Sequence, residues 1–365
     1  MANTSLPEPK APVARRFAVE ANARGTRLAI FAAVGVILVL LPAFAGRSVL
    51  QDLFFVFTML ALAQYWNLLA GYAGLVSVGQ QAFVGLGAYG LFATCLMANL
   101  DPLVGIVVGG IVAALLAVPT AFVVFRLRGA YFAIGTWVAA EVFRLLIAQS
   151  KTTLGGGTGT SLGPEITNAM FGVKWIAATF AVRTPAARDI ATYWLALGLL
   201  AGTLALIYFL LRSRRGLALA AIRDAETAAV SLGVDSFRTR LTIYLVTAFG
   251  TGLVGALIYL QKARVSPDAA FSVLDWTAYV IFIVVIGGIG TIEGPIVGAI
   301  VLYFLQDYLA SFGTWYLIAL GSIAAAVMLV APKGIWGYVA ERFGWQVFPV
   351  RRRLLDTGNA APPPS

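Results

Sequence analysis

Apolar runs of about 20 residues recur along almost the whole chain, and they restrict its fold more than any other feature. Ten such runs can be drawn, near residues 28–45, 49–70, 75–98, 103–125, 131–149, 191–211, 241–260, 276–290, 295–311 and 315–331. Only 12% of the residues are charged, whereas a soluble domain carries about a quarter. The sequence therefore predicts an all-α fold, a polytopic transmembrane helical bundle of about ten spans.

The distribution of positive charge predicts how this bundle is oriented. Ten spans place both termini on one side, and the segments on that side hold 18 of the 26 lysines and arginines. Segments on the other side hold seven, and Arg144 lies within a span. Because cytoplasmic loops are enriched in lysine and arginine, we expect both termini to be cytoplasmic. The net charge of +10 is then a topology signal and does not indicate a nucleic acid partner.

Polar segments divide the chain into regions. We expect a cytoplasmic N-terminal segment over 1–27, a transmembrane domain over 28–340 and a cytoplasmic tail over 341–365. The end of this tail, from Arg351 onward, is predicted to be disordered. Residues 150–190 include a glycine- and threonine-rich run, which is typical of a flexible loop, and we expect them to cover the extracytoplasmic mouth of a pore.

The cytoplasmic segment 212–240 has the pattern of an amphipathic helix. Apolar residues recur at helical spacing, and polar residues fill the other faces. The apolar face comprises Ala218, Ile222, Ala225, Ala229 and Leu232. Gly233 follows at the position where a helix C-cap favours a positive φ. A face made mostly of alanine holds weakly in lipid, so we interpret this helix as a docking surface for a protein partner.

Two glycine-rich stretches, 64–90 and 286–298, interrupt the apolar runs. Glycine permits close packing and broken helices, and in transporters broken helices often line the substrate path. The candidate path residues in these stretches are Asn67, Ser77, Gln80, Gln81, Gly287, Gly288 and Gly290. Tight packing is the alternative interpretation for any single glycine, whereas the clusters as wholes favour a path.

The sequence lacks the motifs of common catalytic and metal-binding sites. It contains no phosphate-binding loop, HExxH, CxxC or GxSxG motif, no histidine, and one cysteine, Cys95. We therefore expect no catalytic residue, no metal site and no bound cofactor. Glu141 and Arg144 are ionisable residues three apart within one span, where they can neutralise each other. A buried charge faces protein or water, so Glu141 is also a candidate path residue.

Six stretches together resemble the permease subunits of branched-chain amino-acid ABC importers. They are NLLAGYAGLVSVGQQAFVGLGAY from Asn67, LRGAYFAIGT from Leu127, GLALAAIRDAE from Gly216, VSP from Val265, GGIGTIEGP from Gly287 and APKGIWG from Ala331. The stretches occur in the family's order between about residues 50 and 337, and the chain resembles the longer of the two permease types.

The resemblance implies a heteromeric importer in the bacterial inner membrane that carries branched-chain or related small amino acids or amides by alternating access. This chain and a second homologous permease would form the pore. Two cytoplasmic subunits would bind ATP and drive transport, and an extracytoplasmic substrate-binding protein would deliver the substrate.

On matching residues, the resemblance places the ATPase-coupling segment at Arg223, Asp224, Ala225, Glu226, Ala229, Leu232 and Gly233. The family often has histidine where this chain has Gln80, which forms hydrogen bonds but does not titrate. Related permeases carry urea and short amides, so the substrate stays open. An ion-coupled transporter or a channel is the alternative function.

Overall fold

The fold is a bundle of membrane-length helices, seen in a computed structural model that describes residues 17–19, 24–150, 154–309, 312–313, 315–331, 333–343, 347–348 and 354–356. Within these residues, seven helical stretches are long and apolar enough to cross a membrane. They are Arg47–Tyr72, Pro102–Val124, Ala130–Ala148, Thr184–Arg212, Ser236–Lys262, Pro267–Gly287 and Trp315–Phe343. The other three expected spans coincide with α1, α3 and α14, so the prediction of a polytopic helical bundle is confirmed.

Helices dominate the order of elements, and the strands of the described residues form two short antiparallel pairs, β1–β4 and β2–β3. The first half contains β1 (Phe17–Val19), α1 (Arg24–Leu40), the 3₁₀ turn η1 (Leu41–Ala43), α2 (Arg47–Asn67), the π-helical turn η2 (Leu68–Tyr72), α3 (Gln80–Met97), α4 (Pro102–Val124), α5 (Ala130–Ala148), the 3₁₀ turn η3 (Gly156–Thr158), β2 (Thr160–Ser161), α6 (Pro164–Asn168) and α7 (Val173–Thr179). The second half contains α8 (Thr184–Arg212), α9 (Arg214–Asp224), α10 (Glu226–Ser231), α11 (Ser236–Lys262), β3 (Arg264–Val265), α12 (Pro267–Ala270), the π-helical turn η4 (Leu274–Ala278), α13 (Tyr279–Gly287), α14 (Glu293–Leu309), α15 (Trp315–Val330), α16 (Gly334–Phe343) and β4 (Leu354–Asp356).

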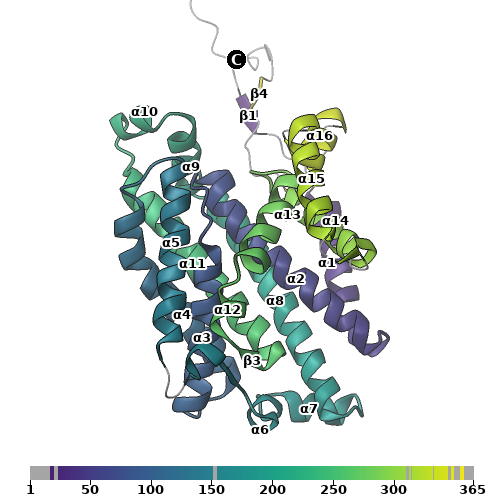
Figure 1. The fold of residues 1–365 in the computed structure, drawn as a ribbon. Coiled ribbons are helices and arrows are strands. Elements are labelled where there is room, and N and C mark those ends of the chain that lie inside the picture. The colour runs from purple at the N-terminus through teal and green to yellow at the C-terminus, as the bar shows by residue number, and fades with distance from the viewer. Residues whose placement is uncertain are drawn as a thin grey trace, which may run out of the picture.

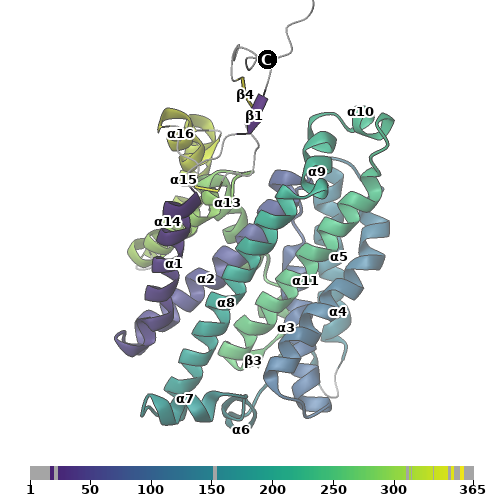
Figure 2. The same ribbon diagram turned by 180° about the vertical axis from the view of Figure 1, so that it is seen from behind.

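The two ends of the bundle carry different connections. Helices α9, α10 and α16 lie at one end together with the antiparallel pair β1–β4, whereas α6, α7 and β3 lie at the other (Figures 1 and 2). These are the two groups of segments that the charge distribution assigns to opposite sides of the membrane. The β1–β4 pair also brings the two terminal regions together at the α9–α10 end. The end that faces the cytoplasm stays a prediction.

The centre of the bundle is formed by α3, α4 and α11, which pack closely along one another. Glycines stand at the crossings, where Gly87, Gly109 and Gly252 leave no space for a Cβ atom. Small residues let helix backbones approach closely in membranes, where van der Waals packing holds helices together. Helix α2 lies beside this centre and contacts α8, α13 and α14.

A buried carboxylate ties three helices together at the α6–α7 end of the bundle. Asp189 of α8 is 2% exposed and forms an ion pair with Arg47 of α2. It also accepts hydrogen bonds from Gln51 Nε2 at 3.2 Å and from Gln261 Nε2 of α11 at 2.9 Å. A buried charge needs such partners, and this cluster was not foreseen from the sequence because its members are far apart in the chain.

Some boundaries differ from the expected ones. The expected span 75–98 begins as helix only at Gln80, because the preceding residues 73–79 are not helical. The loop expected over 150–190 is more ordered than predicted, since it contains α6, α7 and the first turns of α8. The predictions for 1–27 and 341–365 fall mostly outside the described residues, as does the expected disorder after Arg351 apart from β4.

Candidate functional site

The predicted docking helix is two short helices, so the expectation of one continuous helix is wrong. Helix α9 ends at Asp224, and α10 begins at Glu226. Ala225 between them is extended, with φ −157° and ψ 94°. The break rotates α10 relative to α9, so the expected apolar face divides: Ile222 and Ala229 are buried, whereas Ala225 and Leu232 are exposed.

The outer surface of these two helices is apolar at several points. Leu217, Val230 and Leu232 are exposed large side chains at this end of the bundle. Gly233 has φ +86°, as the predicted C-cap requires. Exposed apolar side chains at the tip of a polar segment are typical of a protein-binding surface.

Arg223 reaches from α9 to the end of the α2 span, although its side chain remains 37% exposed. Its Nη1 atom donates a hydrogen bond to the backbone oxygen of Gly71, at 3.3 Å. Gly71 belongs to η2, the π-helical turn that ends the α2 span. Single π-turns inside helices often mark functional positions. Arg223 therefore joins the coupling segment directly to a break in a membrane span.

Glu226 binds residues of α11 and so fixes α10 to that helix. Its carboxylate accepts hydrogen bonds from Ser236 Oγ at 2.8 Å and from Arg240 Nη1 and Nη2 at 2.7 and 3.0 Å. The hydrogen bond from Ser236, together with the hydrogen bonds and charge of Arg240, lowers the pKa of Glu226 below its ordinary 4.5. Asp224 has the most exposed charged side chain in the predicted coupling set, and its carboxylate lies 3.7 Å from the guanidinium of Arg223.

Replacing Glu226 with glutamine is expected to loosen α10 slightly. The ion pair with Arg240 is partly exposed, so its loss should cost roughly 0.2–1 kcal/mol and accelerate amide hydrogen exchange over 226–232. Since the folded pKa is depressed, the stabilisation is present above pH 4.5 and is lost as the pH falls through the folded value. Asp224→Asn is the control, and equal exchange in both variants would contradict this assignment.

The two glycine-rich stretches meet at the α9 end of the bundle. Asn67 donates from Nδ2 to the oxygen of Thr291 at 2.7 Å and accepts from the backbone nitrogen of Gly290 at 2.8 Å. Gln64, which is fully buried, donates to the oxygen of Ile292 at 2.6 Å. We call this contact of Gln64, Asn67, Gly71 and Gly290 the glycine junction.

Glycine is required at this junction for reasons of space and conformation. A Cβ atom on Gly71 would lie 2.4 Å from Asn67 Oδ1 and 2.6 Å from the nitrogen of Gly290. Gly288 and Gly290 have φ of +131° and +77°, which favour glycine. A Cβ atom on Gly287 would lie 1.8 Å from the oxygen of Gly294. Close packing at Gly287 and Gly288, and a positive φ at Gly288 and Gly290, account for all three predicted path glycines, and a role in the path stays a prediction.

Between the junction and the middle of the bundle the chain is not helical, and we call residues 73–79 the non-helical segment. After η2, residues 73–79 run back along α2 until α3 begins at Gln80, whose Nε2 atom donates to the oxygen of Leu62 at 2.9 Å. Leu62 lies ten residues before the end of η2, or about 15 Å along a helix. Helix α3 thus starts deep within the bundle, and the non-helical segment connects this depth to the glycine junction.

The polar residues around this break bind residues of neighbouring helices. Ser77 accepts a hydrogen bond from Trp66 Nε1 on its backbone oxygen, and the side chain of Gln81 pairs with Thr277. The backbone nitrogen of Val78 donates to Thr136 Oγ1 at 3.1 Å. Ser77, Gln80 and Gln81 are all buried, so they hold the break in place in this conformation and are not open to a channel.

Glu141 lies apart from the other predicted path residues. It pairs with Arg144 at 2.5 Å, as the spacing predicts, and Arg144 also pairs with Asp268 of α12 at 2.6 Å. The structure therefore brings Asn67 and Gly290 together near Arg223 but leaves Glu141 on α5. Sequence reasoning missed Thr136, Thr277 and Asp268 as partners, because their contacts join distant parts of the chain.

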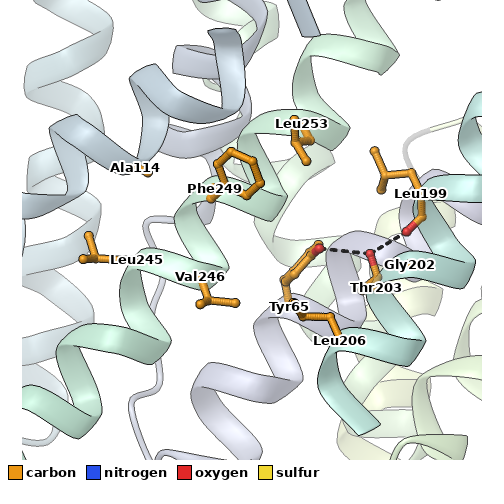
Figure 3. A pocket seen from close by; sticks show the side chains of 10 residues that line it. All are labelled: Tyr65, Ala114, Leu199, Gly202, Thr203, Leu206, Leu245, Val246, Phe249 and Leu253. Carbon is orange, nitrogen blue, oxygen red and sulfur yellow. Dashed lines mark hydrogen bonds between the residues drawn. The ribbon is translucent and has the colours of Figure 1, made fainter. Parts of the chain in front are cut away.

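A cavity of about 440 Å³ lies between α8, α11, α4 and α2. Figure 3 shows its lining, in which Tyr65 and Thr203 share a hydrogen bond of 3.0 Å amid apolar side chains. Substrate pockets combine an apolar wall with several convergent polar groups. This cavity offers few polar groups, and none of the predicted path residues lines it. Among the described residues, no three His, Cys, Asp or Glu side chains are placed to hold a metal ion.

Comparison with known proteins gives a consistent result. Residues 48–332 match the family model described as branched-chain amino acid transport system, permease component. The high-affinity branched-chain amino acid transport system permease proteins LivM of Salmonella typhimurium and of Escherichia coli are each 30% identical over 81% of this chain and 77% of their own length. The probable branched-chain amino acid transport permease protein LivH of Methanocaldococcus jannaschii is 26% identical over 44% of this chain and 49% of its own.

No solved structure matches the chain. The family model spans most of the sequence, and it includes the coupling segment, the glycine junction and the non-helical segment 73–79. Both LivM relatives are named as transport permeases, which agrees with a role in transport rather than catalysis. The chain belongs to the family of permease components of branched-chain amino acid transport systems.

Proposed function

We propose that this chain is the permease subunit of an ATP-driven importer for branched-chain amino acids or related small amino acids and amides. It works in the bacterial inner membrane with a second homologous permease, two cytoplasmic ATP-binding subunits and an extracytoplasmic substrate-binding protein. The family and the names of the LivM relatives support the substrate class. ATP is bound and hydrolysed on the partner subunits.

One observation carries the proposed mechanism, namely the hydrogen bond from Arg223 to Gly71. An ATP-binding subunit seated on α9 and α10 moves these helices, and Arg223 passes the movement to the glycine junction. From there the non-helical segment 73–79 reaches the depth at which α3 begins. Movement of one contact at the cytoplasmic end is thereby linked to a change in the middle of the membrane.

The substrate path is proposed to run along the non-helical segment 73–79. Non-helical backbone at membrane depth is tolerated only where it is covered by protein or lines a water-filled cavity. Gly74 and Val76 are exposed within this segment. Ser77, Gln80 and Gln81 are expected to reach the substrate only after the break rearranges, since they are buried in this conformation. Gln80, which replaces the family's frequent histidine, supports the break through Leu62 and Thr251.

The orientation follows from the same assignment. The α9–α10 end faces the cytoplasm, because an ATP-binding subunit must reach it and because the segments there hold most of the lysine and arginine. Both termini are then cytoplasmic, and residues 28–340 form the permease domain. The α6–α7 end faces the substrate-binding protein.

The test is affinity purification from the native membrane, followed by reconstitution into liposomes. We expect two ATP-binding subunits and a second permease to co-purify, and leucine uptake to require ATP and the binding protein. Competition by isoleucine, valine, urea and acetamide then defines the substrate. Leucine flux through this chain alone would instead indicate a channel or an ion-coupled transporter.

A further inference from the structure

Helix α5 is unusually exposed for a membrane-length helix of this bundle. It is long and apolar enough to cross a membrane, yet only 17% of its membrane window is buried within the chain. Its exposed residues recur three or four positions apart and so share one stripe. We call this stripe the α5 face, and it comprises Tyr131, Ile134, Val138, Val142 and Leu145.

Charges lie within the α5 face. Glu141 precedes the end of α5 by seven residues, which places it about 10 Å inside that end. Glu141 and Asp268 both pair with Arg144, and the side chain of Glu141 remains 45% exposed. Two carboxylates and one guanidinium leave one negative charge in excess. Charged groups within a span rarely face lipid and usually face protein or a water-filled cavity.

The opposite side of α5 is covered by the chain itself. Val78 donates to Thr136 Oγ1 at 3.1 Å, and Thr136 lies about half a turn away from the α5 face on the helix. The α5 face is therefore the side of this helix that stays open to a partner.

The outer face of α4 shows the opposite character. Its exposed side chains include Val107, Ile111 and Leu115, and α4 contains no charged residue. This is the composition that a lipid-facing helix requires. The difference between α4 and α5 is therefore one of chemistry, since both present large exposed apolar stripes.

We propose that the α5 face is the surface on which the second permease subunit sits. The partner is a homologous membrane protein that places a basic or hydrogen-bond-donating side chain opposite Glu141 and Asp268, since their excess negative charge needs a complement. This inference rests on the proposed function, because it requires a second permease.

The test is photo-crosslinking in the complete complex. The photoreactive residue p-benzoylphenylalanine replaces Val138 on the α5 face or, as the matched control, Leu115 on α4; these side chains are 52% and 63% exposed. We expect irradiation to join the second permease to position 138 and to give no adduct at position 115. Ile134 on the same stripe serves if the Val138 variant does not assemble.

The outcomes separate this inference from the proposed function. If ATP-driven uptake and a co-purified second permease persist but neither position 138 nor 134 forms an adduct, the α5 face is not the seam. An adduct at position 115 alone would likewise overturn the inference. If no second permease co-purifies, the proposed function itself fails.

Discussion

Replacing Arg223 with alanine is expected to uncouple ATP hydrolysis from uptake. The hydrogen bond to Gly71 is the direct link between the coupling segment and the glycine junction, and charge-assisted hydrogen bonds are worth about 1.5–3 kcal/mol. Every 1.4 kcal/mol corresponds to about a tenfold change in an equilibrium. We therefore expect uptake per ATP hydrolysed to fall at least about tenfold, while the complex still assembles and hydrolyses ATP.

The measurement compares leucine uptake and phosphate release in the same proteoliposomes. Arg238→Ala at the start of α11 is the matched control, because this arginine lies outside the predicted coupling set and its side chain is 86% exposed, so both rates should stay nearly unchanged. Arg223→Lys keeps the charge but loses the planar guanidinium, so partial recovery is expected.

A double variant with Glu226 also replaced extends the test, since it releases α10 from α11 as well. Normal ATP-driven uptake by this double variant would rule out transmission through these residues. Loss of the ATP-binding subunits from the complex would indicate docking instead of transmission.

The sequence predicted the architecture because membrane spans carry their signal locally. Each expected apolar run coincides with a helix, and the Glu141–Arg144 ion pair follows from helical spacing alone. The positive φ of Gly233 was likewise predictable from one residue and its position. These properties depend on neighbours along the chain, which periodicity and composition report well.

Properties that depend on distant partners were not predictable in the same way. The periodic pattern of 212–240 continues through Ala225, but the helix breaks there. On either side of the break, Arg223 binds Gly71 and Glu226 binds Arg240, and these contacts hold the segment in place. The meeting of Asn67 with Gly290 joins residues more than 200 positions apart. No one-dimensional pattern encodes that contact, although both stretches were identified as glycine-rich breaks.

The non-helical segment 73–79 shows why apolar runs locate spans better than they locate helix ends. Leu75, Val76 and Val78 are apolar, so hydropathy extends the span across them. Their conformation is instead fixed by Trp66, Thr136 and Leu69, which bind the backbone of the segment. The glycines of 64–90 therefore indicated a break, but they did not show where the helix ends, because distant partners satisfy the backbone of the segment.

Replacing Gly87 with alanine is expected to destabilise the packing of α3 against α11. A Cβ atom on Gly87 would lie 2.0 Å from the backbone oxygen of Gly252 and 2.7 Å from its Cα. Backbone atoms of a packed helix cannot move aside as a flexible side chain can, so α3 and α11 must separate. Overpacking of this kind costs about 1–3 kcal/mol and occasionally more.

The crossing involves three helices, which increases the expected cost. A Cβ atom on Gly109 of α4 would lie 2.4 Å from the oxygen of Gly87, so a shift of α3 away from α11 is opposed by α4. In a helix interior, alanine is otherwise favoured over glycine by about 1 kcal/mol, so the steric effect must exceed that gain. The net change is expected to be a lower yield of folded protein and unfolding at a lower fraction of denaturing detergent.

Gly198 of α8 provides the matched control, since it is also a helical glycine but has nothing within 4 Å of the added Cβ atom. Gly198→Ala should therefore be neutral or stabilising by up to about 1 kcal/mol, while Gly87→Ala unfolds earlier. Unfolding in mixed detergent can be followed through the fluorescence of the eight tryptophans. If both variants unfold at the same detergent fraction, the close approach of α3, α4 and α11 does not limit the stability of the bundle. A lower midpoint for Gly87→Ala alone would establish that backbone contact at these glycines, rather than hydrophobic burial, sets the packing of this membrane protein.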